Sequence, residues 1–167
     1  MSNMYTETAF TIDTSSIKFG PGITKESGYE LSRLGATRVL VVTDPQLANS
    51  PAVQTAIDSL KQANIDYAVF DQVSVEPTDS SLKRAIKFAV EGNFDGFLPV
   101  GGGSSIDTAK AVNLYSTYPA EFLEYVNAPI GKGTPVPGDL KPLVAVPTTA
   151  GTGSETTGVA IFDYEEL

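Results

Sequence analysis

The chain has 167 residues, of which 41% are hydrophobic and 19% are charged. These proportions are typical of one globular domain and exclude a disordered chain. The formal net charge of −9 argues against a nucleic-acid partner, because phosphate binding requires clustered lysine and arginine. The sequence contains neither cysteine nor histidine, which excludes disulfides, thiolate metal sites and the commonest general acid–base group.

The sequence shows no targeting or membrane signal. No apolar run approaches the roughly 20 residues that are needed to cross a bilayer. Residues 1–11 lack the features of a secretion signal and the arginine-rich pattern of a transit peptide. We therefore expect a cytoplasmic protein without a membrane partner, and a mitochondrial location is the alternative for a eukaryotic source.

Short apolar runs alternate with longer amphipathic segments, which predicts an α/β fold with a mainly parallel sheet flanked by helices. Residues 10–13 and 17–19 are expected to form a short N-terminal β-hairpin. The turn at residues 20–22 then leads into a helix that ends at Gly35. The core positions expected for this helix are Ile23, Leu31 and Leu34.

The remaining elements follow from apolar periodicity. Strands are expected at residues 38–43, 67–70, 94–100 and 143–146, and residues 158–163 have the composition of one more. Helices are expected around Val53, Ile57 and Leu60, around Leu82, Ile86, Phe88 and Ala89, and over residues 104–115. Residues 127–142, rich in glycine and proline, are expected to form a surface loop.

The strongest local signal is the run Gly101-Gly102-Gly103-Ser104-Ser105-Ile106-Asp107 between a predicted strand and a predicted helix. Glycines allow a ligand to approach the backbone closely, and a helix N-terminus presents free N–H groups that suit a phosphate. The alternative is structural, because Ser104 and Asp107 have the spacing of a capping box. Phosphate binding is the favoured interpretation.

Two further segments carry polar groups at strand ends. Asp44, in Thr43-Asp44-Pro45, could accept hydrogen bonds from a ribose and would favour NAD over NADP, or it could simply cap a helix that begins with proline. Residues 147–154 are rich in small and hydroxylated side chains. They suit a loop that wraps a polar ligand, and by composition alone they equally suit a flexible loop.

The glycine run, continued by Thr108-Ala109-Lys110, and the later run Pro147-Thr148-Thr149-Ala150-Gly151-Thr152-Gly153-Ser154-Glu155 together resemble the iron-containing (group III) alcohol dehydrogenase family. The resemblance covers the chain from the Phe19-Gly20-Pro21-Gly22 turn onward. Residues 125–133 and 155–164 are similar to the hydroxyacid-oxoacid transhydrogenase branch.

The resemblance implies a Rossmann-like N-terminal domain that binds NAD, followed in the family by an all-helical domain that holds the metal. It assigns Asp44 to the adenosine ribose and Gly101, Gly102, Gly103 and Ser104 to the pyrophosphate. It places Thr148, Thr149 and Thr152 on the other side of the nucleotide. Asp107 and Lys110 match family positions at the start of the glycine-loop helix, and Asp107 is expected to bind the cofactor as well.

The sequence departs from the family at two points. Glu76-Pro77-Thr78 stands where the family often has Asn-Pro-Thr, whose asparagine can touch the nucleotide. The family's metal ligands, one Asp and three His, lie beyond Leu167. We therefore expect residues 1–167 to be a truncated NAD-binding domain without catalytic or metal-binding residues, inactive alone, from a homo-oligomeric enzyme that uses iron or zinc.

Two alternatives stay open on the sequence. One is half of a zinc enzyme of the glycerol dehydrogenase or dehydroquinate synthase type, although residues 107–111 favour the alcohol dehydrogenase side. The other is a non-catalytic module that senses NAD or binds a partner through the surface that the helical half would cover. That surface is expected to be apolar.

Overall fold

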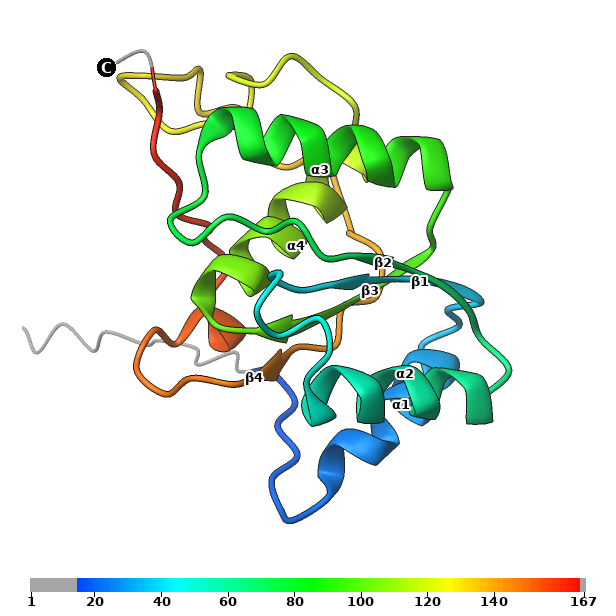
Figure 1. Ribbon diagram of the computed structural model, residues 1–167. Coiled ribbons are helices and arrows are strands. Elements are labelled where there is room, and N and C mark those ends of the chain that lie inside the picture. The colour runs from blue at the N-terminus through cyan, green and yellow to red at the C-terminus, as the bar shows by residue number, and fades with distance from the viewer. Residues whose placement is uncertain (1–14, 166–167) are drawn as a thin grey trace, which may run out of the picture.

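The computed structural model describes residues 15–165 (Figure 1). The helices are η1 (Ile23–Glu26), α1 (Ser27–Arg33), α2 (Pro51–Gln62), α3 (Asp79–Gly92), α4 (Gly103–Thr117) and η2 (Ser154–Thr156), where η denotes a 3-10 helix. The strands are β1 (Arg38–Val42), β2 (Asp66–Phe70), β3 (Gly96–Gly101) and β4 (Val146–Pro147). None of the described helices is long and apolar enough to cross a membrane.

The four strands form one parallel sheet in the order β2-β1-β3-β4. Helices α1 and α2 cover one face of the sheet, and α3 and α4 cover the other (Figure 1). The chain runs outward from β1 to β2, then crosses back to β3 on the opposite side of β1. The strand order therefore reverses between β1 and β3, which is the point where open α/β sheets bind ligands.

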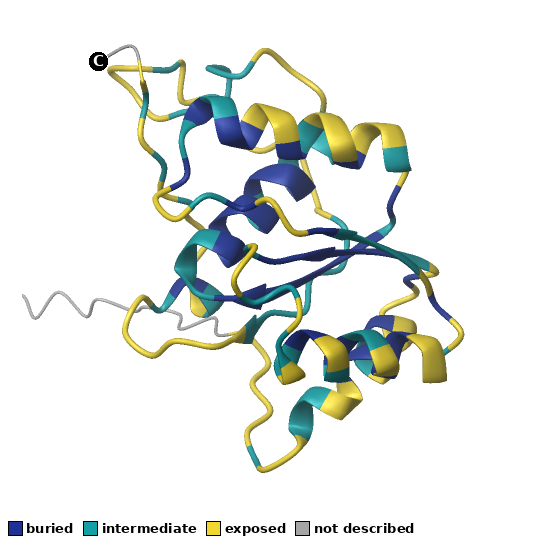
Figure 2. Ribbon diagram, in the orientation of Figure 1, coloured by how far each residue is buried: buried dark blue, intermediate teal, exposed yellow. Residues whose placement is uncertain are grey.

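Strand β1 divides the core in two, because successive side chains of a strand point to opposite faces. Val39 and Val41 pack toward α1 and α2, whereas Leu40 and Val42 pack toward α3 and α4. All four side chains are buried, as are the residues of β3 (Figure 2). The continuous apolar run in β1 is thus explained by a strand covered on both faces.

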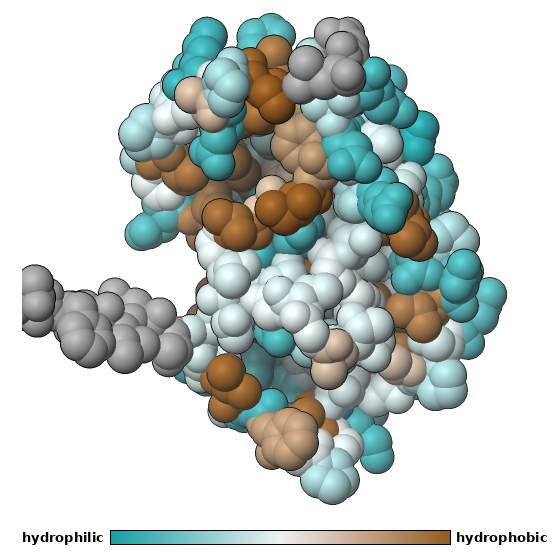
Figure 3. Space-filling view, turned by 90° about the vertical axis from the view of Figure 1, so that its left-hand side faces the viewer, coloured by the Kyte–Doolittle hydropathy of each residue, from teal (hydrophilic) through white to brown (hydrophobic). Residues whose placement is uncertain are grey.

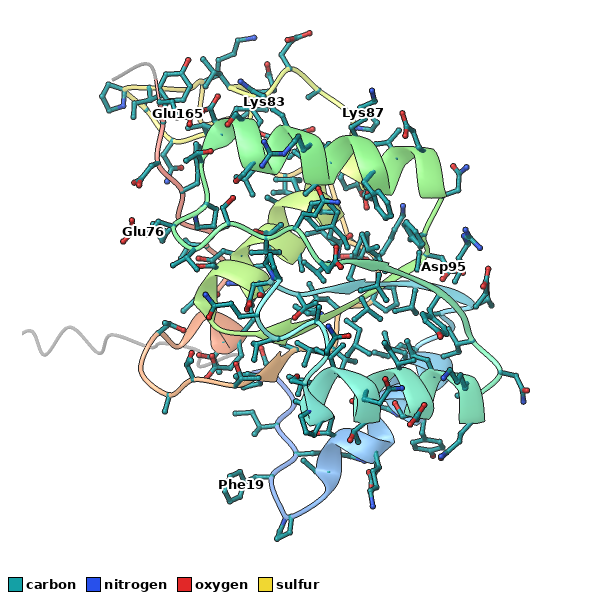
Figure 4. All side chains as sticks on the ribbon, in the orientation of Figure 1. Phe19, Glu76, Lys83, Lys87, Asp95 and Glu165 are labelled. Carbon is teal, nitrogen blue, oxygen red and sulfur yellow. The ribbon has the colours of Figure 1, made fainter. Side chains whose placement is uncertain are left out.

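Asp95 holds the amino ends of β1 and β3 together. Its carboxylate accepts hydrogen bonds from the backbone N–H groups of Thr37 and Arg38, at 2.9 and 2.7 Å, and from the Thr37 hydroxyl at 2.6 Å. The Arg38 guanidinium lies 5.2 Å from the ring centre of Phe94 and pairs with Asp66 on β2. Asp95 lies at the opposite end of the sheet from the 147–153 loop (Figures 1 and 4).

The structure confirms the strands predicted at 38–43, 67–70 and 94–100, and the helices predicted after each of them. Residues 127–142 form no helix or strand, as predicted. The predicted strand 10–13 lies outside the described residues. The prediction for 17–19 was wrong, because no strand forms there and Phe19 is fully exposed (Figure 4). Lys18 instead pairs with Glu26 and Glu30.

Three other predictions need correction. Leu34 is not a core residue, because it is 48% exposed at the end of α1. The strand predicted at 143–146 is reduced to β4 and one bridge between Leu143 and Phe97, at a sheet edge where flanking prolines lack an N–H. Residues 158–163 form only one bridge, from Asp163 to Thr78, and side chains of α4 bind the Val159 carbonyl and the Ile161 N–H.

Candidate functional site

The three predicted ligand-binding segments meet at the carboxyl edge of the sheet. Asp44 follows β1, residues 101–103 end β3 and begin α4, and Thr148 follows β4. Because these strands are parallel neighbours, their carboxyl ends lie side by side, on the left in Figure 1. Segments that lie as far apart in the sequence as Asp44 and Thr148 therefore form one continuous edge at the point where the strand order reverses.

The glycine run places the N-terminus of a long buried helix at this edge. Gly102 is the N-cap of the 15-residue helix α4, and no side chain caps it. The N–H groups of Ser105 and Ile106 bond to the Gly102 carbonyl, so the helix starts ahead of Ser104. The capping box considered for Ser104 and Asp107 was therefore wrong, and the positive end of the helix dipole faces the edge.

Two glycines of the run lie against threonines that follow β4, and the third lies against the first turn of α4. A Cβ on Gly102 would lie 3.1 Å from Thr149 Oγ1, and one on Gly103 would lie 3.0 Å from Thr152 Cγ2. A Cβ on Gly101 would overlap the side chain of Ser105. The absence of side chains on these glycines thus allows residues 147–153 to lie directly over the first turn of α4.

The threonine loop, residues 147–153, is anchored at its start. The Thr148 N–H donates a 3.0 Å hydrogen bond to the carbonyl of Gly101. Residues 147–152 are exposed, and Gly151 and Gly153 have positive φ angles of 131° and 65°, which side chains disfavour. The loop therefore presents its threonines to solvent beside the glycine run.

Asp44 lies in the turn that follows β1, and its two carboxylate oxygens have different surroundings. Its Oδ1 accepts hydrogen bonds from the N–H groups of Gln46 and Leu47, at 2.9 and 3.0 Å, and so caps a turn rather than a helix. Helix α2 begins later, where Ser50 is the N-cap. Oδ2 of Asp44 points toward Gly101, within 3.8 Å of the position of a Cβ there. One oxygen is thus free to meet a ligand at the edge.

Asp107 does not reach the open edge. Its side chain is buried, Oδ1 accepts hydrogen bonds from Ser154 Oγ and from Lys110 Nζ, and Oδ2 accepts one from the Ile161 N–H at 3.1 Å. Ser104, in the first turn of α4, is only half buried. The sequence reasoning did not find the role of Ser154, although the spacing of Asp107 and Lys110 on one helix face was a usable signal.

A groove of about 1800 Å³ borders the candidate site but contains none of its glycines. Its lining comes from residues 15–34, residues 110–115 of α4, residues 122–147 and residues 155–164. Several of its apolar side chains are exposed: Ile17, Phe19, Leu34, Ile130, Val159 and Ile161. Figure 3 shows this side of the molecule, with apolar areas above and below a weakly polar centre. Burial raises the pKa of Tyr115, which also lines the groove, to about 12, so its hydroxyl stays protonated.

The described residues offer no metal centre. They contain no group of three or more His, Cys, Asp or Glu side chains that could hold a metal ion. Iron and zinc sites in proteins use histidine or cysteine, and the sequence has neither. These residues therefore do not fit the metal that the resemblance implies, and no step through a metal follows from them.

The parallel sheet reverses its strand order between β1 and β3, and the glycine run lies at a helix N-terminus beside that reversal. These features define a Rossmann-like α/β domain. Residues 14–167 match the profile of the iron-containing alcohol dehydrogenases. The chain belongs to this family, as its two motifs predicted.

Two comparisons place the chain more closely. It is 59% identical over 167 residues to the mitochondrial hydroxyacid-oxoacid transhydrogenase of Bos taurus and 56% identical to that of Homo sapiens. Both alignments cover 99% of this chain and 36% of the relative, so the chain spans about a third of the length of these proteins. The similarity to the transhydrogenase branch is thereby confirmed.

Solved structures confirm the fold. A 1,3-propanediol oxidoreductase superposes with a TM-score of 0.84 at 29% identity, and an alcohol dehydrogenase from Oenococcus oeni superposes with a TM-score of 0.81 at 33% identity. Each match covers 95% of this chain and 41% of the other.

The transhydrogenases are named as mitochondrial proteins, whereas the sequence predicted a cytoplasmic protein and left the mitochondrial alternative open.

Proposed function

We propose that residues 1–167 form the NAD-binding domain of an oxidoreductase that transfers a hydride between nicotinamide and the carbinol carbon of an alcohol or hydroxyacid. The observation that carries the proposal is the meeting of Asp44, the glycine run and the threonine loop at one edge of the sheet. Family membership and the transhydrogenase relatives support the same activity.

The parts of the site match the parts of a dinucleotide. Gly101, Gly102, Gly103 and Ser104 surround an uncapped helix N-terminus, where backbone N–H groups and the helix dipole stabilise a pyrophosphate. Asp44 Oδ2 would accept hydrogen bonds from the ribose hydroxyls and would repel a 2′-phosphate. The side chains that would cover the pyrophosphate from the other side are Thr148, Thr149 and Thr152.

The residues of this chain bind and orient the cofactor. When bound, NAD supplies the hydride acceptor at C4 of its nicotinamide ring. Hydroxyls and N–H groups from two opposing segments would fix the pyrophosphate, and this would set the direction in which the nicotinamide end of the bound cofactor extends. Asp107 has its carboxylate oxygens engaged within the fold, so we assign it a supporting role rather than a cofactor contact.

Polarisation of the substrate oxygen would come from a metal held outside the described residues. Hydride transfer from an alcohol needs a group that lowers the pKa of the hydroxyl, usually a metal ion or a histidine. We therefore propose that the 167 residues alone bind the dinucleotide without turnover, and that iron or zinc acts in the whole enzyme.

The experiment uses the protein expressed from its complete gene and supplied with Fe(II). Calorimetric titration with NAD, with NADP as the paired ligand, is expected to show tighter binding of NAD. A hydroxyacid deuterated at its carbinol carbon, mixed with an oxoacid and a trace of NAD, is then expected to pass its deuterium to the reduced oxoacid. Mass spectrometry of the products measures this transfer.

The outcomes separate the candidate functions. Failure to bind NAD would overturn the proposal. NAD binding with neither deuterium transfer nor release of NADH, with either iron or zinc, would instead favour the non-catalytic module. Steady release of free NADH from an alcohol, without transfer to an oxoacid, would support a simple alcohol dehydrogenase over a transhydrogenase.

A further inference from the structure

Lys110, Asp107 and Ser154 form a polar cluster between α4 and residues 154–161. Lys110 Nζ lies 3.3 Å from Asp107 Oδ1, 3.0 Å from Ser154 Oγ and 2.7 Å from the Val159 carbonyl oxygen. Ser154 is 5% exposed and Asp107 is 9% exposed. A largely buried ion pair such as Lys110–Asp107 contributes little net stability compared with apolar residues of the same volume. Its main effect is to fix the position of residues 154–161 relative to α4.

Thr152 connects this cluster to the glycine run. The Ser154 N–H donates a 3.3 Å hydrogen bond to Thr152 Oγ1, and Thr152 lies against Gly103, with Oγ1 3.2 Å from the position of a Cβ there. Gly153, with φ of 65°, forms the tight turn that brings Ser154 back to Thr152. A continuous set of contacts therefore runs from Lys110 and Asp107 through Ser154 to Thr152.

We infer that Lys110, Asp107 and Ser154 are positioning residues that hold the Thr152 hydroxyl over the pyrophosphate site before the dinucleotide binds. The threonine loop is exposed, and its other anchor is the bond from Thr148 to Gly101 at its far end. A loop that is already fixed loses less conformational entropy on binding, so the cluster increases affinity without touching the ligand. This inference rests on the function proposed above.

A double-mutant cycle tests this role, because residues that act through one another have non-additive effects. The protein expressed from its complete gene is titrated with NAD as wild type, Ser154→Ala, Thr152→Val and the double variant. Ser154→Ala is expected to weaken NAD binding about tenfold in the wild-type background and less than about twofold when residue 152 is already valine. A purely structural role for Ser154 would give the same loss in both backgrounds.

Lys110 supplies a second set of variants should Ser154→Ala fail to fold. Lys110→Met is expected to weaken NAD binding about tenfold, with a loss below about twofold in the Thr152→Val background, and to accelerate hydrogen exchange of the Ile161 amide. Lys110→Arg is expected to recover part of both losses because it keeps the charge. Lys61→Met, which removes an exposed ion pair with Asp58 on α2, is the matched control and should bind NAD as the wild type does.

The results distinguish this inference from the proposed function. Equal losses in both backgrounds, or unchanged affinity in the Ser154 and Lys110 variants, would overturn the positioning role and leave the nucleotide site intact. Lost affinity with unchanged exchange at Ile161 would instead indicate direct contact between Lys110 and the ligand. A wild-type protein that does not bind NAD would overturn both.

Discussion

The hydroxyl oxygen of Thr149 lies 3.1 Å from the position that a Cβ on Gly102 would occupy. Thr149 belongs to the exposed loop after β4, and Gly102 is the N-cap of α4. A pyrophosphate bound to the first turn of α4 would need the same space as that Cβ. A single carbon added at Gly102 is therefore expected to affect ligand binding more than the stability of the fold.

Gly102→Ala is expected to weaken NAD binding at least tenfold, which corresponds to about 1.4 kcal/mol. The new Cβ would crowd Thr149 and block the approach to the helix N-terminus, whereas φ of −77° is accessible to alanine, so the fold should persist. Calorimetric titration and thermal unfolding measure the two effects. Gly158→Ala is the control, since a Cβ there meets nothing within 4 Å. Equal NAD affinity in both variants would contradict a ligand at Gly102.

Asp44→Asn is expected to weaken NAD binding by about tenfold while improving binding of NADP relative to NAD. The substitution keeps an oxygen that can accept from Gln46 and Leu47, so the turn is preserved, but it removes the charge that would repel a 2′-phosphate. The ratio of the two dissociation constants is the readout. Asp71→Asn, at an exposed carboxylate directly after β2, is the matched control. An unchanged ratio in Asp44→Asn would show that this carboxylate does not contact the ribose.

Much of the fold could be predicted because its signals are local. The apolar run of β1 and the helical spacing of Val53, Ile57 and Leu60 each identify an element that the structure confirms. The run Gly101-Gly102-Gly103 likewise marked the junction of β3 and α4. Strand periodicity failed at residues 158–163, where the Asp107 carboxylate binds the Ile161 N–H, the Lys110 ammonium binds the Val159 carbonyl, and Asp163 pairs with the backbone of residues 77 and 79.

The site was predicted in its parts but not in its contacts. The sequence indicated which segments are rich in glycine and threonine, yet the pairing of Gly102 with Thr149 and of Gly103 with Thr152 depends on strand order, which periodicity does not encode. Ser154 was missed for the same reason: its partner Asp107 is 47 residues away. The assignment of site residues to NAD stays a prediction that the titrations above test.

Gly28→Ala is expected to lower the free energy of unfolding by about 1–3 kcal/mol or more. A Cβ on Gly28 would overlap the backbone carbonyl of Ser59, because α1 and α2 pack with their backbones in close contact there. The Gly28 N–H also donates a 3.0 Å hydrogen bond to Ser59 Oγ. Denaturant unfolding measures the loss. Ser59→Ala, which removes only that hydroxyl, is expected to cost about 1 kcal/mol.

The contrast with a second glycine makes this prediction specific. Gly20→Ala adds the same atom at a position with nothing within 4 Å, and its stability should equal that of the wild type. If Gly28→Ala were as stable as Gly20→Ala, the close approach of α1 to α2 would be contradicted.

Asp95→Asn is expected to reduce the acid sensitivity of the fold. Burial raises the pKa of Asp95, but hydrogen bonds from the Thr37 side chain and from the backbone N–H groups of Arg38 and Thr37 outweigh it, so the pKa in the folded protein lies below its usual value. Above the pKa that Asp95 has in the unfolded chain, about 3.9, the ionised carboxylate therefore contributes its full stability to the fold. This contribution is lost as the pH falls through the lower pKa that Asp95 has in the folded protein.

The measurement is the difference in the free energy of unfolding between pH 7 and pH 3. In Asp95→Asn the stability at pH 7 should fall by about 1–2 kcal/mol, because the amide group cannot accept every bond that the carboxylate accepts from Thr37 and Arg38. The loss from pH 7 to pH 3 should then be smaller than in the wild type. Asp139→Asn, at an exposed residue, should leave the loss unchanged. A variant that lost as much stability on acidification as the wild type would show that Asp95 is not the group that titrates between β1 and β3.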